Sequence, residues 1–480
     1  MSISYLESSS IDSQSGVMYD YSEEENPCIG EKIIDGKYGE LILLGYNGPS
    51  EQTGQKKQQC KMELSRRKVG NGVKKCQISV VNGPAAQAPA VLDSSKHVVS
   101  YAYSKTQTVI VEYNSDPGKD MFQIGRSSED MIDFTVVDTQ LALSAAGSSG
   151  SPSTRRDSRP ISSTISRYAC RLLIDREYPS KAYVYAAGFD ASRNIFLGEK
   201  ASKWTKANKE LDGLTTNGIL ILHPDRSMDD SSDDDNSKGD KKKMYVWREV
   251  KIKDQSYRNL YISYQVSVDG DIYSLRETRS SNSRGTLFPD ESNMLQDGTL
   301  VDLCGATLLW RSAEGLEKSP SAMDLERALN ALNAGKPQCP VNLNTLIIPR
   351  KKTSSRTASS RQPYVYLECG HVQGKHKWGQ HTGHSGTSFH KCPICLIESQ
   401  RVLQLTMGMQ PAFHLDSGSL DYAFNPCGHV ASLLTVRYWS AIPLPHGTNS
   451  FHPVCPFCTT LLATDKPYVR LIFQDHLFDS

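Results

Sequence analysis

Two short motifs near the C-terminus each occur twice in the sequence. Residues 368–372 read ECGHV and residues 426–430 read PCGHV, and each is followed by a cysteine pair, CPIC at 392–395 and CPFC at 455–458. Four pairs of thiol and imidazole side chains fill two tetrahedral sites, and a set without carboxylates or an open position is typical of structural zinc. The expected zinc ligands are Cys369, His371, Cys392, Cys395, Cys427, His429, Cys455 and Cys458.

The sequence leaves open which pairs share an ion. Pairing the first pair with the third and the second with the fourth gives a cross-brace, and sequential pairing satisfies the same chemistry. We favour the cross-brace, because interleaved sites lock a segment of this length into one compact domain. Four further histidines between the first two pairs are surplus and are expected in a loop: His376, His381, His384 and His390.

Composition limits the other possibilities. The 480 residues carry 54 Lys and Arg against 53 Asp and Glu, so no global field attracts nucleic acid or a membrane surface. Twelve cysteines with half of them clustered favour metal binding in a reducing compartment over disulfides. A polar, acidic N-terminus and no apolar run of about 18 residues predict a cytoplasmic protein without a membrane span.

The N-terminal part is expected to be mainly β. Short apolar or alternating segments separated by Gly, Asn, Asp and Pro indicate strands, among them 40–45, 106–113, 183–187 and 259–268. In the last of these, Leu260, Ile262, Tyr264, Val266 and Val268 are expected to cover one face of a sheet. Two low-complexity insertions, near 143–165 and 228–243, lack the apolar residues that would offset the entropy of ordering them.

One helix is predicted between the two halves. Ser319 is its expected cap and Pro320 its first residue, Leu325, Leu329 and Leu332 repeat at helical spacing, and Gly335 ends it. The resulting domain plan is a disordered tail at 1–27, a β-rich domain at 28–311, a helix and linker at 312–362 and a zinc domain at 363–480.

At these motifs the chain closely resembles the Pellino family of E3 ubiquitin ligases, whose RING-like domain has the same order of cysteines and histidines. The N-terminal half is similar to the family's forkhead-associated (FHA) domain in the segments FQIGRSSEDMIDFTVVDT, TISRYACRLL, AAGFDASRNIFLGEKASKW and LDGLTTNGILILHP. The resemblance implies an FHA-type β-sandwich with an inserted appendage, followed by a small RING-like zinc domain.

FHA domains hold phosphothreonine in loops at one end of the sandwich. The resemblance assigns this role to Arg126 of the IGR segment, Ser166 of TISR, and Thr216 and Asn217 of TTNG, with Gly218 allowing a tight turn. A planar guanidinium suits phosphate because it donates two charge-assisted hydrogen bonds. The chain departs from the general pattern in having Ala169 where a histidine is usual, and its domain is about twice the usual length.

The resemblance further implies a RING-type ubiquitin ligase that positions a charged E2 enzyme, without a catalytic cysteine of its own. Ile394 and Trp439 are the expected E2 contacts, although Thr459 replaces the usual basic residue after the last ligand. Phosphorylated kinases of the Pelle or interleukin-receptor-associated type, in Toll-like innate signalling, are the implied partners. The alternative is a non-enzymatic scaffold that binds phosphorylated kinases. Binding of nucleic acid through the zinc region is disfavoured, because the region of the ligands has no basic stripe with aromatics.

Overall fold

The computed structural model describes residues 36–46, 61–136, 163–224, 264–276, 281–335, 338–351, 361–382, 388–446 and 450–473. Contacts divide the chain into residues 1–36 and residues 37–480, and every feature below belongs to the second unit. The expected tail at 1–27, the insertion near 228–243 and most of the insertion near 143–165 lie outside the described residues. In the part of the chain that is described, no helix is long and apolar enough to cross a bilayer.

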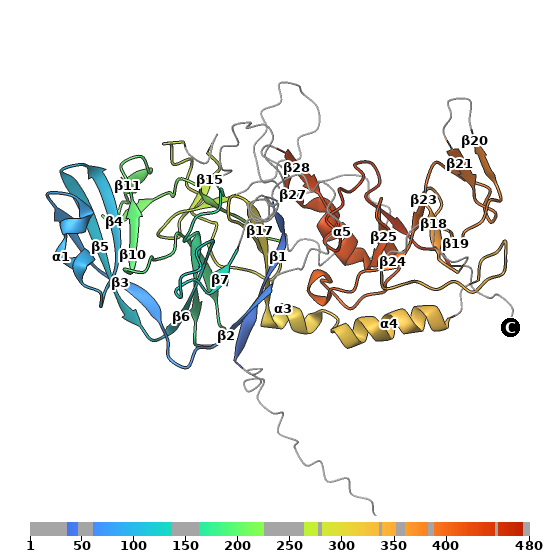
Figure 1. Ribbon diagram of the computed structural model, residues 1–480, viewed down its shortest axis with the longest axis horizontal. Helices are drawn as coiled ribbons and strands as arrows, with labels where there is room; N and C mark the ends of the chain where they lie inside the picture. The colour runs from blue at the N-terminus through green and yellow to red at the C-terminus, as the bar shows by residue number, and fades with distance from the viewer. Residues whose placement is uncertain are drawn as a thin grey trace, which may run out of the picture. The chain divides into compact units, whose positions relative to one another are not determined.

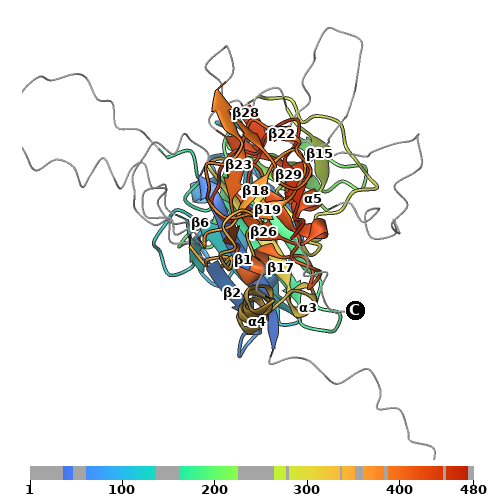
Figure 2. The same ribbon diagram turned by 90° about the vertical axis from the view of Figure 1, so that its right-hand side faces the viewer.

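The protein is mainly β, as expected. Its largest sheet is antiparallel and has seven strands, in the order β15 (Ile272–Ser274), β14 (Tyr264–Val266), β13 (Ile219–Leu222), β16 (Leu300–Asp302), β17 (Ala306–Ser312), β1 (Lys37–Tyr46) and β2 (Lys61–Ser65). The strands β1 and β17, which are far apart in sequence, lie side by side (Figures 1 and 2) and pair from Gly39 with Ser312 to Tyr46 with Ala306.

Two four-stranded sheets and a short ribbon complete the N-terminal region. The first sheet has the order β10 (Asn194–Leu197), β4 (His97–Ser104), β5 (Gln107–Asp116) and β3 (Gly72–Val81), and the helical turns η1 (Ala85–Gln87) and α1 (Pro89–Leu92) precede β4. The second has the order β7 (Phe134–Thr135), β6 (Lys119–Gly125), β8 (Cys170–Asp175) and β9 (Ala182–Ala186). The ribbon pairs β11 (Lys203–Thr205) with β12 (Leu211–Gly213).

The seven-stranded sheet is apolar on both faces because each face covers a separate core. In β1, Leu41 and Leu43 belong to the large core shared with the two four-stranded sheets, whereas Ile42 and Leu44 belong to a core that includes C-terminal residues. Alternate residues of a strand point to opposite faces, so the continuous run LILL is the pattern of a strand buried on both sides. The run ILIL in β13 divides between the two cores in the same way.

The expected strand at 259–268 is partly described. Its residues 264–266 form β14, and residues 259–263 lie outside the described part. Within the described part, Tyr264, Val266 and Val268 face the large core together, as expected. The polar residues between them are buried as well, since Gln265 is only 1% exposed and Ser267 is fully buried. Both polar side chains are hydrogen-bonded, Gln265 as an acceptor from Arg276 and Ser267 as a donor to Asp212.

Two helices, not one, lie between the halves (Figure 1). The helix α3 (Ala313–Lys318) is capped by Ser312, and α4 (Ala322–Ala334) begins with a capping box between Ser321 and Asp324. Ser319 is therefore not the cap of the long helix, and its buried hydroxyl instead donates to the carbonyl of His414 at 2.7 Å. Gly335 ends α4 as expected, and Leu325 and Leu329 pack in a core with strands of the C-terminal region.

The C-terminal region contains short strands around the repeated motifs. Two three-stranded sheets have the orders β19 (Val372–Gln373), β18 (Tyr364–Tyr366), β23 (Val402–Gln404) and β20 (Gln380–Thr382), β21 (Ser388–Lys391), β22 (Glu398–Ser399). A four-stranded sheet has the order β24 (Thr406–Met407), β26 (His429–Ala431), β25 (Tyr422–Phe424), β29 (Tyr468–Arg470). A two-stranded sheet pairs β27 (Pro443–His446) with β28 (Ser450–Pro453). The helical elements are η3 (Pro411–Phe413) and α5 (Leu433–Ala441). Each CGH motif lies at a hairpin turn, between β18 and β19 or between β25 and β26.

Candidate functional site

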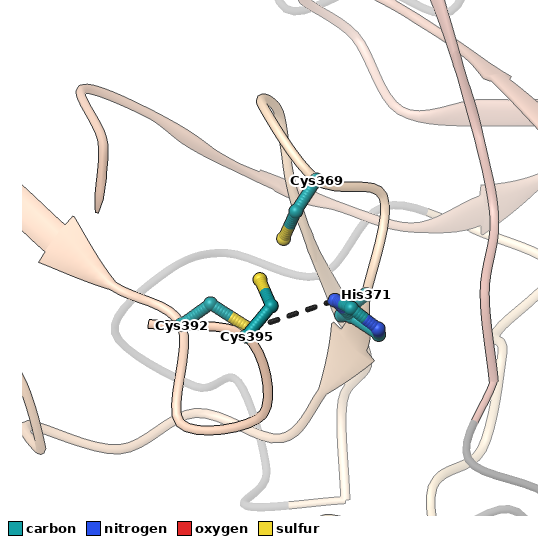
Figure 3. Close-up of side chains that lie close together, drawn as sticks. All are labelled: Cys369, His371, Cys392 and Cys395. Atoms are coloured by element: carbon teal, nitrogen blue, oxygen red, sulfur yellow. Dashed lines mark hydrogen bonds between the residues drawn. The ribbon is translucent and has the colours of Figure 1, made fainter. Parts of the chain in front are cut away.

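The first Cys/His cluster brings together Cys369, His371, Cys392 and Cys395. Their sulfur atoms and one imidazole nitrogen all lie within 4.8 Å of one another. Figure 3 shows the four side chains converging from two turns. The Sγ atom of Cys392 lies 3.7 Å from Nδ1 of His371. Three sulfur atoms and one nitrogen at this spacing can hold one tetrahedral metal ion.

Both turns of this cluster follow from their local sequence. Gly370 has a φ of +80°, and its amide donates to the carbonyl of Tyr366 at 2.8 Å, which closes the CGH turn. A Cβ at this position would lie 2.4 Å from the carbonyl oxygen of Arg470. In the CPIC turn, the amide of Leu396 donates to the carbonyl of Cys392 at 2.9 Å. The turn that this hydrogen bond closes places the sulfur atoms of Cys392 and Cys395 on the side of the cluster.

The second cluster repeats the first with different residues. Cys427, His429, Cys455 and Cys458 also place their ligand atoms within 4.8 Å of one another. Gly428 has a φ of +76°, and Cys455 Sγ lies 3.7 Å from Nδ1 of His429, as in the first cluster. The amide of Thr459 donates to Cys455 at 2.7 Å in the CPFC turn. The sequence repeat is therefore a structural repeat.

The expected cross-brace is wrong, because each cluster joins consecutive pairs. Interleaved ligands are not needed to hold the region together, since the backbone does so. The amide of Ile472, beyond β29, donates to the carbonyl of Gly370 at 2.8 Å. The amide of Thr406 donates to the carbonyl of Gly428 at 2.9 Å. The C-terminal segment thus returns to the first CGH turn, and the linker between the repeats pairs with the second.

The donor sets suit a metal that binds sulfur and nitrogen. No carboxylate belongs to either group, and burial raises the pKa of the Cys369 thiol to about 12 and that of Cys455 well above its usual value. Binding a metal must displace these protons, because the ligand is the thiolate. His376 and His390 are outside both clusters. His376 donates through Nε2 to the side-chain oxygen of Gln373 at 2.8 Å, and His384 lies outside the described residues.

The two expected E2 contacts have different environments. Ile394, between the cysteines of CPIC, is 40% exposed, and Leu396 and Ile397 beside it are also exposed. Trp439 is fully buried in α5, where its indole donates to the carbonyl of Phe413 at 3.0 Å. The expectation that Trp439 contacts E2 is therefore a wrong prediction, because the ring has no accessible surface. Leu396 and Ile397 directly follow Cys395, the last ligand of this cluster, and no separate signal in the sequence pointed to Ile397.

Three of the four expected phosphothreonine residues meet at adjoining loops. Asn217 donates through Nδ2 to the hydroxyl of Ser166 at 3.1 Å and to the carbonyl of Thr164 at 2.8 Å. The backbone amide of Arg126 donates to the carbonyl of Ser166 at 3.1 Å, and its Nε donates to Ile165 at 2.8 Å. The side chain of Arg126 is exposed, and so is Thr216, next to Asn217 in the loop between β12 and β13.

A β-rich domain with this loop cluster, followed by a small domain with two four-ligand Cys/His clusters, defines a class of protein, the RING-type ubiquitin ligases with an FHA domain. A family model described as "Pellino, FHA domain" matches residues 29–328, and one described as "Pellino, RING domain" matches residues 332–479. The chain belongs to the Pellino family and is an E3 ubiquitin-protein ligase.

Relatives match the chain over nearly its whole length. Protein pellino of Drosophila melanogaster is 49% identical over 459 residues, which is 94% of this chain and 98% of that protein. E3 ubiquitin-protein ligase pellino homolog 2 of Homo sapiens is 43% identical, covering 95% and 99%. E3 ubiquitin-protein ligase pellino homolog 3 of Mus musculus is 44% identical, covering 94% and 93%.

Proposed function

We propose that this ligase recruits phosphothreonine-bearing proteins through its FHA domain and promotes ubiquitin transfer to them from an E2 bound at its RING domain. The observation that carries the proposal is the convergence of Arg126, Ser166 and Asn217 at one set of loops. An exposed guanidinium beside a serine hydroxyl and an amide offers a phosphate monoester both charge and directed donors. Thr216 stands beside them to contact the peptide.

We assign one structural zinc ion to each Cys/His cluster. The three sulfur atoms and one nitrogen of each group match the ligand preference of Zn²⁺, and a closed four-ligand set leaves no position for a reacting water. The ions would supply folding free energy to a region whose strands are only two to four residues long. The chain's own residues then present the surface that an E2 recognises.

The proposed E2 surface is centred on Ile394, with Leu396 and Ile397 beside it. These three apolar side chains are exposed on and after the CPIC turn. Exposed apolar side chains grouped within four residues of sequence are suited to a transient interface. A RING domain accelerates transfer by positioning the E2 thioester against the substrate amine, so the ligase needs no nucleophile of its own.

The identity of the partners rests on the family resemblance. Kinases of the Pelle or interleukin-receptor-associated type, phosphorylated on threonine in Toll-like innate signalling, are the substrates that it implies. The cytoplasm is the proposed location, because zinc-binding thiols stay reduced there.

Phosphothreonine recognition is tested with Arg126→Ala in the full chain and a fluorescent peptide library that carries one fixed phosphothreonine. Binding measured by anisotropy should fall by at least tenfold, since a charged donor to phosphate is lost. Arg66→Ala is a matched control, because Arg66 is another exposed arginine of this region that donates to a single backbone carbonyl, that of Arg176, at 3.0 Å. Equal binding by wild type and Arg126→Ala would refute the phosphate site.

The E2 surface is tested by autoubiquitination with E1, a panel of E2 enzymes, ubiquitin and ATP. Ile394→Ala should slow chain formation at unchanged zinc content. Leu461→Ala removes an apolar side chain of similar exposure, 41%, after the second cysteine turn, and should leave the rate unaltered. A variant at Ile394 with wild-type activity across the panel would rule out this surface.

A further inference from the structure

A buried arginine lies beneath the proposed phosphothreonine loop. Arg276, two residues after β15, is only 6% exposed, and its guanidinium donates to three different segments of the chain. The acceptors are Gln265 Oε1 in β14 at 2.9 Å, the carbonyl of Thr215 at 3.0 Å and the carbonyl of Ser281 at 2.6 Å. Thr215 immediately precedes Thr216 and Asn217, so one of the three hydrogen bonds holds the loop itself.

Gln265 supports the same loop from the other end. A Cβ added to Gly218 would lie 2.4 Å from the side-chain nitrogen of Gln265, so this amide fills the space where any side chain at position 218 would lie. The position of Gln265 is set by the sheet, in which it pairs with Leu220 of β13 and with Tyr273 of β15. Gly218 has a φ of +66°, and the turn therefore depends both on glycine and on this close approach.

The loop is thus held in place on both sides of Thr216 and Asn217, its two proposed peptide contacts. Thr215 is bound before them and Gly218 is supported after them, while Asn217 crosses to Thr164 and Ser166 on the neighbouring loop. A loop held in its binding conformation loses less conformational entropy when a peptide binds. Arg276 does not need to touch the phosphate to affect its affinity.

We infer that Arg276, held by Gln265, is a positioning residue that fixes the Thr216–Asn217 loop for phosphothreonine binding. The inference deepens the proposed function and depends on it. The planar guanidinium is required because its Nε, Nη1 and Nη2 point to three fixed acceptors, whereas a lysine ammonium can reach only some of them. Gln265 and Arg276 lie about fifty and about sixty positions further along the chain than the recognition loop that they contact.

The test compares Arg276→Met, Arg276→Lys and Gln265→Met in the full chain, with the fixed-phosphothreonine peptide library as the probe. Arg276→Met should weaken binding by on the order of tenfold, the effect of one hydrogen bond from a charged donor, and Arg276→Lys should recover part of the loss. Gln265→Met should also weaken binding, because it removes the side-chain oxygen that accepts from Arg276. Arg284→Met is the control, because Arg284 lies 5.5 Å over Trp204 in the adjoining segment.

A double-mutant cycle separates positioning from general destabilisation. If Arg276 acts through the loop, Arg276→Met in an Asn217→Ala background should cost little more affinity than Asn217→Ala alone. Additive losses would overturn the inference, and so would wild-type affinity in Arg276→Met. If Arg276→Met fails to fold, Arg276→Lys and Gln265→Met carry the same comparison. Loss of binding in Arg126→Ala with none in these variants would refute only the positioning role, whereas unchanged binding in Arg126→Ala would refute the phosphate site.

Discussion

At the scale of single residues, the two CGH turns depend on glycine. The amide of each glycine closes its hairpin, and its backbone passes within contact distance of another strand. For Gly428, a Cβ would lie 2.0 Å from the carbonyl oxygen of Gln404. Because the clash is with backbone, no side-chain rotation can relieve it.

We therefore expect Gly428→Ala to destabilise the second cluster by about 2 kcal/mol or more, through the positive φ and the overlap together. The measurement is the rate at which a colorimetric chelator removes zinc, which should rise in the variant. Gly335→Ala is the matched control, since its φ is −58° and the nearest atom to an added Cβ is 3.6 Å away. Equal release rates in the two variants would contradict this account.

We expect the partly buried imidazole of His97 to make the folding stability depend on pH. Burial, with Arg193 and Arg171 nearby, lowers the pKa of its imidazole to about 4, and the ring packs edge-on against Phe189 at 4.7 Å between centroids. Between about pH 6.5 and pH 4 the unfolded chain binds a proton that the folded chain does not. The contribution of His97 to stability is therefore complete above pH 6.5 and is lost as the pH falls towards 4.

The expected result is a pH-dependent difference between the wild type and His97→Gln. Urea unfolding of both proteins between pH 4 and pH 7.5 should show the wild-type advantage shrinking in the acid range, where protonation of the histidine opposes folding. A difference in midpoint that stays constant over this range would show that His97 does not titrate as its burial requires.

At the scale of elements, the repeated unit is a CGH hairpin followed by a CPxC turn. Each unit supplies all four ligands of one cluster, so each metal site is local to its own stretch of chain. The spacing of ligands within a pair is readable in the sequence because it is set by a turn of three or four residues. The choice of partner pair is not, because both arrangements satisfy the same chemistry.

Paired cysteine variants distinguish the two arrangements by zinc content. Cys427→Ser with Cys458→Ser removes ligands from one cluster only and should leave about one zinc ion per chain. Cys427→Ser with Cys369→Ser removes a ligand from each cluster and should leave about none. A cross-brace would reverse these two outcomes, so elemental analysis of both proteins decides between them.

At the scale of the whole molecule, one arginine connects the FHA and RING regions. Arg311, in β17, is fully buried, and it donates to the carboxylate of Asp297 at 3.0 Å and to the carbonyl of Ala412 at 2.6 Å. The hydroxyl of Tyr438 in α5 donates to the carbonyl of Gly298 at 2.6 Å beside it. These polar contacts surround a core shared by β1, β13, β17 and the C-terminal region.

Arg311→Met should cost about 3–5 kcal/mol of unfolding free energy, because it removes the donor to the buried carbonyl of Ala412 and the cation that pairs with Asp297. Chemical denaturation of the full chain provides the measurement. Arg327→Met is a matched control, since Arg327 also pairs with an aspartate, Asp324, but is 72% exposed, and its loss should cost no more than about 0.5 kcal/mol. Similar costs for the two substitutions would show that Arg311 does not link the regions.

Much of this architecture is local in origin and was predictable. The eight cysteines and histidines, the strand at LILL and the end of α4 at Gly335 depend on turns, apolar runs and caps that span only a few residues. The start of α4 was misplaced because Ser319 and Ser321 both suit a cap, and only the buried contact of Ser319 with His414 separates them.

The eight cysteines and histidines of the two clusters and the mainly β fold therefore follow from short motifs and alternation in the sequence, whereas the phosphothreonine residues come from the resemblance to the family and stay a prediction. Tertiary structure alone decided that the metal sites are sequential, that Trp439 is buried and that Arg276 supports the Thr216–Asn217 loop. These features depend on which surfaces pack together over long stretches of chain. The local sequence around Trp439 or Arg276 is compatible with an exposed side chain and with a buried one. Only the packing of distant segments against them decides which of these environments each side chain has.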